Sequence, residues 1–341
     1  MRLALAVLFM SAAFAQQPRI ANARLETIAV SGGLTGQINR FLSASAGPEW
    51  VGYSEPMIAG EHHSCCWNSD QCCGRCTLES HDQTSGSRPV SGGTEVKLEG
   101  PQTLVVLLRL SNHGVDKVQA YTLDCELDAG GLPFHWLTGV SPLESVNYLG
   151  TVAPVHKGAI HAIAMQADPA ADAVLERLAG PSAPEKQRED VAFWLGSARG
   201  RRGVDALKVM LARDPSDQVR AHIMFALSVS KDPAALAQML ESARTDPSGH
   251  VRSQALFWLA QKAGEKETAA ITRAISEDPD TKVKKQAVFA LQQLPHDEGI
   301  PLLIKVARTN ANPEVRKQAI FWLGQSNDQR ALKFFEDVLA K

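Results

Sequence analysis

The chain has 341 residues, of which 44% are hydrophobic and 21% charged, and its formal net charge at pH 7 is -2. This composition is typical of a folded globular protein and excludes a disordered or fibrous chain, and the length predicts two units. The balanced charge gives no broad basic surface. We therefore expect no binding of nucleic acid.

Residues 1–15 have the features of a secretory signal peptide. Arg2 supplies the positive charge, residues 3–10 are apolar, and Ala-Phe-Ala at 13–15 fits a cleavage site before Gln16. The apolar run is too short to span a bilayer, and no later segment approaches the length of a spanning helix. We expect an exported protein, periplasmic or extracellular, with no membrane insertion.

Residues 18–140 predict a small β-rich domain. Four segments rich in Val, Leu, Thr and Tyr are bounded by Gly, Asn and Asp, as strands are. These segments are ARLETIAV (23–30), EVKLEG (95–100), TLVVLLRL (103–110) and KVQAYTLDCEL (117–127). LTGQINRFL (34–42) predicts a helix, and a long segment from about 59 to 93 is rich in Ser, Gly, His and Cys.

All the cysteines belong to this first domain, and they predict disulfide bonds in an exported chain. They are Cys65, Cys66, Cys72, Cys73, Cys76 and Cys125. Sequence neighbours are disfavoured as pairs because their Cα atoms lie too close, so several connectivities stay open, and we expect Cys125 to join the other cysteines.

The same segment allows a metal site or a redox pair. A tetrahedral zinc site could use the imidazoles and thiolates of His62, His63, Cys65, Cys66, Cys73 and Cys76, and Cys-Gly-Arg-Cys at 73–76 has the spacing of a redox pair. We favour disulfides and expect no bound metal. The alternative hypothesis is a metal- or redox-responsive module with the rest of the chain as its partner-binding arm.

The chain contains no recognisable catalytic motif. It lacks the zinc-protease, nucleophile-elbow, P-loop and dinucleotide-binding patterns, and its acidic residues are scattered over helix surfaces. We therefore expect no enzymatic activity and no cofactor.

The second part of the chain, residues 141–341, repeats with a period of 32 residues. The repeated segments align an aromatic column, Phe193, Phe225, Phe257, Phe289 and Phe321, with a basic column, Arg188, Arg220, Arg252, Lys284 and Arg316. A fixed period of this length indicates a solenoid of helix pairs. We predict about six pairs from Ser141 onward and a final capping helix, and an all-α array after the β-rich domain.

The joints between the helices carry helix-start signals. Asp214-Pro215, Asp246-Pro247 and Asp278-Pro279 each place an oxygen acceptor before a proline, which predicts that the aspartates are N-caps. Ser141-Pro142 with Glu144 predicts a capping box at the start of the array.

The segment DPSGHVRSQALFWL (246–259) resembles the HEAT repeat, in the short bacterial form also found in phycobilisome lyases. The resemblance covers about residues 141–341 and implies an α-solenoid with a binding role. It also implies hydrogen bonds along the stack between the turn aspartate and the basic residue six positions later: Asp214 with Arg220, Asp246 with Arg252, and Asp278 with Lys284. Ser182 and Asn310 replace this aspartate, so we expect looser joints there.

The phenylalanine column is the candidate binding site. At 100° per residue, Phe257 points nearly opposite the buried face centred on Val251, Ala255 and Leu259, to which Trp258 is also assigned. The family implies that these helices line the concave face, with rings about 10 Å apart. We predict an apolar groove, edged by Gln254, Gln286 and Gln318, that binds a segment of another exported protein; the alternative is that neighbouring helices half-bury the rings.

Overall fold

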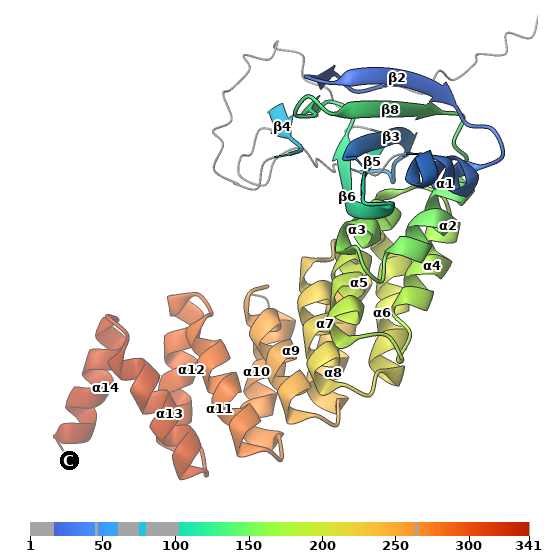
Figure 1. Cartoon of the computed structure of the whole chain (residues 1–341). Coiled ribbons are helices and arrows are strands. Elements are labelled where there is room, and N and C mark those ends of the chain that lie inside the picture. Colours follow the sequence, from blue (N-terminus) through green and yellow to red (C-terminus); the bar gives the residue numbers. More distant parts are fainter. Residues whose placement is uncertain (1–16, 45–46, 61–74, 80–101, 263–264, 341) are drawn as a thin grey trace, which may run out of the picture. The chain divides into compact units, whose positions relative to one another are not determined.

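The computed structural model of the chain describes residues 17–44, 47–60, 75–79, 102–262 and 265–340. Its internal contacts divide the chain into two compact units, 1–174 and 175–341, which are described in turn (Figure 1). The predicted boundary at 140/141 marks the change from strands to helices, whereas the contact-based boundary falls inside the fourth helix.

A five-stranded mixed sheet forms the centre of the first unit. Its order is β2-β8-β3-β5-β6, in which β2, β8 and β3 run parallel and β5 is antiparallel to both of its neighbours. The strands are β2 (Arg24–Ala29), β3 (Glu49–Pro56), β5 (Thr103–Ser111), β6 (Gly114–Thr122) and β8 (Pro133–Thr138), and α1 (Leu34–Ala44) follows β2. Asn112 and His113 connect β5 to β6 with positive φ, as a tight hairpin turn requires.

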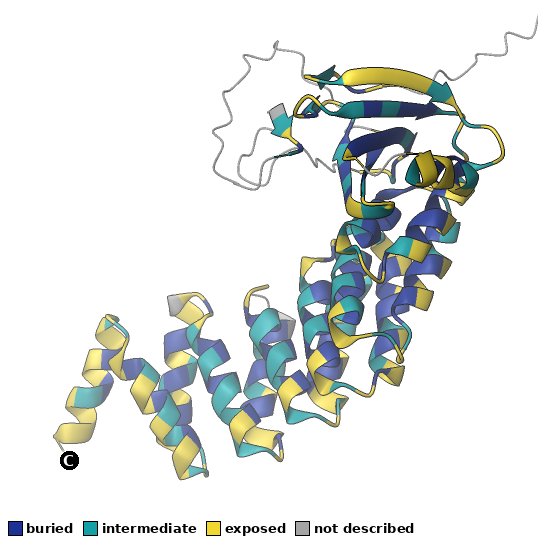
Figure 2. Cartoon of the chain, in the orientation of Figure 1, coloured by how far each residue is buried: buried dark blue, intermediate teal, exposed yellow. Residues whose placement is uncertain are grey.

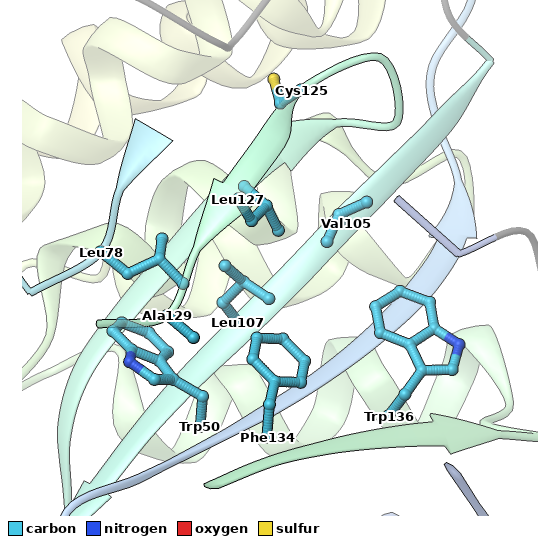
Figure 3. Packing of buried hydrophobic residues seen from close by; sticks show 9 residues of the cluster. All are labelled: Trp50, Leu78, Val105, Leu107, Cys125, Leu127, Ala129, Phe134 and Trp136. Atoms are coloured by element: carbon cyan, nitrogen blue, oxygen red, sulfur yellow. The ribbon is translucent and has the colours of Figure 1, made fainter. Parts of the chain in front are cut away.

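A second, three-stranded parallel sheet has the order β1-β7-β4, with β1 (Ile20–Ala21), β4 (Arg75–Thr77) and β7 (Glu126–Asp128). Buried side chains from both sheets make a single cluster: Trp50, Leu78, Val105, Leu107, Cys125, Leu127, Ala129, Phe134 and Trp136 (Figure 3). Outward from this cluster, Glu79 accepts hydrogen bonds from the indole Nε1 of Trp50 (2.7 Å) and from the guanidinium of Arg109 (2.8 and 2.9 Å). The bonds from Arg109 hold the pKa of Glu79 below its ordinary value and fix the segment that carries β4.

The predicted β-rich character of this region is confirmed, with differences in its elements. The helix at 34–42 and the strands at 23–30 and 103–110 form, but the segment 117–127 divides between β6 and β7. The predicted strand at 95–100 lies outside the described residues. Sequence reasoning missed β3 and β8.

The first helix pair, α2 (Pro142–Val152) and α3 (Lys157–Met165), belongs to the sheet-containing unit, where α3 packs on β6. Gly158 allows this approach, since a Cβ atom there would overlap the main-chain carbonyl of Val118. Ser141 is the N-cap of α2 and Pro142 its first residue, as predicted, although the serine side chain makes no capping hydrogen bond.

The helical array has the predicted 32-residue period. The second helices of successive pairs are α5 (Glu185–Ala198), α7 (Asp217–Val229), α9 (Gly249–Ala260), α11 (Thr281–Gln292) and α13 (Pro313–Gly324), and each starts 32 residues after the one before. The first helices are α4 (Ala170–Leu178), α6 (Gly200–Arg213), α8 (Pro233–Thr245), α10 (Glu265–Glu277) and α12 (His296–Thr309), and α14 (Gln329–Leu339) follows the sixth pair. Within the second unit, successive helix pairs bury apolar side chains against one another, and exposed residues gather at helix ends and on α14 (Figure 2).

The predicted N-caps at the aspartates are wrong by two residues. Ser216, Ser248 and Asp280 are the N-caps, and the helices start after them. Asp214, Asp246 and Asp278 instead end the preceding helices, and each side chain accepts a hydrogen bond of 2.9 Å from the main-chain N–H two residues on. The proline after each aspartate therefore lies in an Asx turn between helices rather than at the first helical position.

Candidate functional site

A ladder of buried ion pairs runs through the joints of the second unit. The guanidinium of each basic residue donates two hydrogen bonds to the aspartate 26 residues later: Arg188 to Asp214 (2.7 and 3.1 Å), Arg220 to Asp246 (3.2 and 3.3 Å), and Arg252 to Asp278 (2.7 and 2.9 Å). The side chains of the first and third pairs are at most 10% exposed. Such two-pronged contacts fix both the distance and the angle between successive repeats.

This ladder corrects the pairing that the family resemblance implied. The arginine six residues after an aspartate contacts its main-chain carbonyl, not its carboxylate: Arg220 Nη1 donates to Asp214 O (3.0 Å), and Arg252 Nη1 to Asp246 O (2.8 Å). Each carboxylate instead pairs with the arginine of the preceding repeat, 26 residues earlier in the chain. The ladder consequently includes Arg188, which the prediction omitted.

The rung from α11 to α13 is chemically different. Lys284 stands in the arginine column and donates to the carbonyl of Ser276 (3.0 Å), not to Asp278 as implied. Its counterpart one repeat on is Asn310, whose amide donates to Ile275 O (3.4 Å). Both members of the pair are thus replaced together, and this joint has no ion pair among the described residues.

A continuous row of aromatic rings crosses the second helices. Neighbouring rings in this aromatic row have their centroids 4.9 to 6.2 Å apart, and the row reads Trp194, Phe193, Phe225, Trp258, Phe257, Phe289, Trp322 and Phe321. The predicted spacing of about 10 Å between phenylalanines is wrong for Phe193 with Phe225 (5.9 Å) and for Phe257 with Phe289 (6.2 Å). At the other two joints a tryptophan ring lies between the phenylalanines. Trp258, assigned to the buried face from sequence, is half-buried and belongs to this row.

Two kinds of joint alternate along the aromatic row. Phe193 stacks on Phe225 and Phe257 on Phe289 with interplanar angles of 18° and 4°. At the other two joints a tryptophan ring meets the phenylalanine of the preceding second helix at a larger angle, 39° for Trp258 on Phe225 and 42° for Trp322 on Phe289. The sequence signal is an alternation of Phe-Trp with Phe-Ala: residues 194, 258 and 322 are Trp, and residues 226 and 290 are Ala. This period of two repeats was not used in the prediction.

The burial of the phenylalanines agrees with the alternative prediction, in which neighbouring helices half-bury the rings. Phe193, Phe225, Phe257 and Phe289 are half-buried by their neighbours, and only Phe321 is mainly exposed, at 52%. Ring stacking therefore supplies part of their burial. An accessible aromatic strip remains, because each of these rings keeps contact with solvent.

Polar side chains border the aromatic row on the N-terminal side of each helix. Gln254, Gln286 and Gln318 are half-buried, and in the described residues their amides make no hydrogen bond to the rest of the chain. In the equivalent position, α7 carries His222, whose ring packs edge-on against Phe225 at 5.7 Å and whose pKa burial lowers. Three successive second helices, α9, α11 and α13, thus offer amides with unused donors and acceptors.

The charges along this border change sign. On α5, Glu189 and Asp190 are half-buried, and both pair with Lys186 (3.7 and 2.9 Å). On α11, Lys282 and Lys285 line a surface depression with Gln286, Phe289, Gln318 and Trp322. The aromatic row is therefore acidic at one end and basic at the other.

Most of the predicted cysteine and histidine site lies outside the described residues: His62, His63, Cys65, Cys66, Cys72 and Cys73, as does the predicted signal peptide. The structure places half-buried Cys76 on β4 and buried Cys125 just before β7, its neighbour in the small sheet. No cluster of metal-ligating side chains occurs among the residues with described positions. The disulfide framework stays a prediction.

No helix in the described ranges has the length and apolarity needed to cross a bilayer. The glutamines, phenylalanines and ion pairs all belong to the repeating helix pairs, so the fold and the site define an α-solenoid repeat protein. More specifically, residues 171–260 and 268–341 match the family model of HEAT repeats, and this part of the chain consists of HEAT repeats as the sequence indicated. The sheet lies before the matched residues.

Two solved structures are similar to part of this chain. One is the complex of CpcE and CpcF of phycocyanin lyase from Nostoc sp. PCC7120, 24% identical, which covers 47% of this chain and 100% of that chain with a TM-score of 0.35. The other is human deoxyhypusine hydroxylase in complex with glycerol, 16% identical, covering 57% of this chain and 90% of that chain with a TM-score of 0.28. No curated protein matches the sequence.

Proposed function

We propose that the chain is an interaction scaffold whose HEAT repeats bind a segment of a partner protein along the aromatic row. The observation that carries this proposal is the unbroken contact of eight rings across α5, α7, α9, α11 and α13. Aromatic side chains held rigid by their neighbours supply large contact area at a small entropic cost.

The packing of the helices supports a concave location for this surface. The second helices pack against one another more closely than the first helices do. In a curved stack the tighter row lies on the inner side, and the extended inner surface is the part that solenoids use for binding. A bound segment would there contact several repeats at once.

Export is part of the proposal, and it rests on the signal-peptide features of residues 1–15. The partner would then be another exported protein or peptide, met in the periplasm or outside the cell. The cysteines would be paired in that oxidising compartment.

Site-specific photo-crosslinking in the exporting host tests the proposed surface. Benzoylphenylalanine is placed at Gln286 or Gln318 in the full chain, and the matched controls carry it at Arg273 or Lys305, which are exposed on the first helices α10 and α12. We expect the same protein adduct from both groove positions and none from the controls. Adducts of equal yield from both sets, or none from the groove, would contradict the proposal.

A variant of the exposed ring supplies the second test. Phe321→Ser removes the ring that is 52% exposed, so the cost in folding free energy is expected to stay below about 1 kcal/mol. The adduct from Gln318 should fall strongly in this variant. An undiminished adduct would show that the aromatic row does not hold the partner.

A further inference from the structure

A second set of glutamines follows the rings on the same helices, and the inference drawn from it rests on the proposed function. In α9, α11 and α13 the order is Gln, then Phe three residues later, then Gln four residues after that, which adds Gln261, Gln293 and Gln325. These three residues are C-caps in the αR conformation, so helical geometry continues through them. At 1.5 Å per residue the two borders lie about 4.5 and 6 Å on either side of the rings along each helix axis.

Amides on both sides of an apolar strip match the chemistry of a peptide main chain. A glutamine amide offers both donor and acceptor, as each peptide unit does, whereas a surface selecting only apolar side chains needs neither. The amides of Gln254, Gln286 and Gln318 are unengaged by the described part of the chain. They can therefore bond to a ligand without breaking bonds inside the protein.

The spacing of the helices fits an extended ligand. Packed helices lie about 8 to 10 Å apart, and a polyproline II segment advances about 3.1 Å per residue with three residues per turn. One helix therefore corresponds to about three residues of such a segment. Every third side chain then points at the aromatic row, and the main chain between them passes the glutamines.

The charges specify one end of the ligand. Lys282 and Lys285 line the depression with Phe289 and Trp322, and Lys317 is exposed on α13. None of the three lysines forms an ion pair with another described residue. At the α5 end, Glu189 and Asp190 outnumber Lys186. Opposite charges on the ligand would complement this asymmetry and fix its direction.

We infer that the groove binds an extended segment of a partner protein that has an apolar residue at about every third position and an acidic residue over the depression between α11 and α13. The glutamine borders hold its main chain. Lys282 and Lys285 select the acidic side chain.

We would test this assignment by selecting peptides from a displayed random library on the immobilised full chain. The peptides have about 16 residues, a length that spans five helices. Lys282→Glu/Lys285→Glu is the test variant, and Arg273→Glu/Lys305→Glu on the first helices changes the net charge by the same amount. We expect enriched peptides with acidic residues and three-residue apolar spacing. Their affinity should fall about tenfold or more with the test variant and about twofold or less with the control.

The outcomes separate the inference from the proposed function. Enriched peptides that need Phe321 but show no acidic bias, or bind the reversed-charge variant equally well, would overturn the inference and leave the scaffold standing. Loss of peptide binding in Gln286→Ala, by about twofold to tenfold, would support the main-chain role. Retention of neutral oligosaccharides that depends on Phe321, with no peptide enriched, would overturn the peptide assignment. Peptides independent of Phe321 would contradict the scaffold itself.

Discussion

Removing one rung of the ion-pair ladder should strongly destabilise the array, although only one side chain is changed. Arg252→Ala deletes two charge-assisted hydrogen bonds to Asp278 and the bonds to the carbonyls of Asp246 (2.8 Å) and Pro247 (3.2 Å). The carboxylate of Asp278 stays buried after this change and still accepts the hydrogen bond from the main-chain N–H of Asp280 (2.9 Å), but it loses its charged partner. Breaking a buried pair in this way costs about 3 to 5 kcal/mol of unfolding free energy.

Lys284→Ala is the matched control, because Lys284 stands in the same column and makes one exposed hydrogen bond to a carbonyl. Its expected cost is below about 1 kcal/mol. Chemical denaturation followed by circular dichroism compares the two variants, and hydrogen exchange localises the loss, since repeat arrays can unfold in segments. Equal destabilisation of the two variants, within about 1 kcal/mol, would refute the importance of the buried pair.

Two further predictions concern burial and close packing. Burial raises the pKa of Glu55 from 4.5 to about 8, so the folded state binds this proton more tightly and the unfolding free energy should fall as pH rises between those values. The fall should be on the order of 4 kcal/mol, and Glu55→Gln should flatten it in denaturation measured as a function of pH. An unchanged profile in the variant would exclude Glu55 as the source of the pH dependence. Gly196→Ala places a Cβ against the carbonyl of Ala226 and should lower the unfolding free energy by more than about 2 kcal/mol. The control Gly36→Ala in α1, where a Cβ meets open space, should be neutral or stabilising in thermal melts. Equal effects of the two variants would count against close contact between α5 and α7.

The solenoid could be predicted because every repeat must bury the same face against a nearly identical neighbour. That requirement copies side chains such as Leu207 and Met239 into one column, and both are fully buried. Repetition also made the phenylalanine column visible. It could not show how far the rings lean toward one another, since that depends on whether Ala or Trp follows in the adjoining helix.

The pairing within the ladder was beyond sequence reasoning for a related reason. In a strictly periodic chain, separations of 6 and 26 residues both connect the arginine and aspartate columns, so the pattern alone does not choose between them. Only the joint geometry does: the aspartate side chain turns toward the arginine of the previous pair while its carbonyl faces the next one. The helix starts were displaced for the same reason, because an Asx turn and an N-cap use the same residue types.

Strand β3 was missed because its buried residues do not follow the expected alternation of polar and apolar side chains. Most of β3 is buried, including Glu49 and Glu55, and Gly52 stands where the side chains of Leu107 and Phe134 leave no space for a Cβ. Buried carboxylates and a central glycine both argue against a strand when the sequence is all that is known. Tertiary contacts override that preference here.

The replacement of an ion pair by Lys284 and Asn310 gives the array an uneven mechanical stiffness. Bidentate rungs resist both stretching and tilting, so the joints from α5 to α11 behave as stiff couplings. The joint between α11 and α13 has no such brace, and an applied load or a mismatched ligand would bend the array there first. Because this is the joint that carries Lys285 and Gln318, the compliant end of the solenoid is also the end at which the groove can adjust its width.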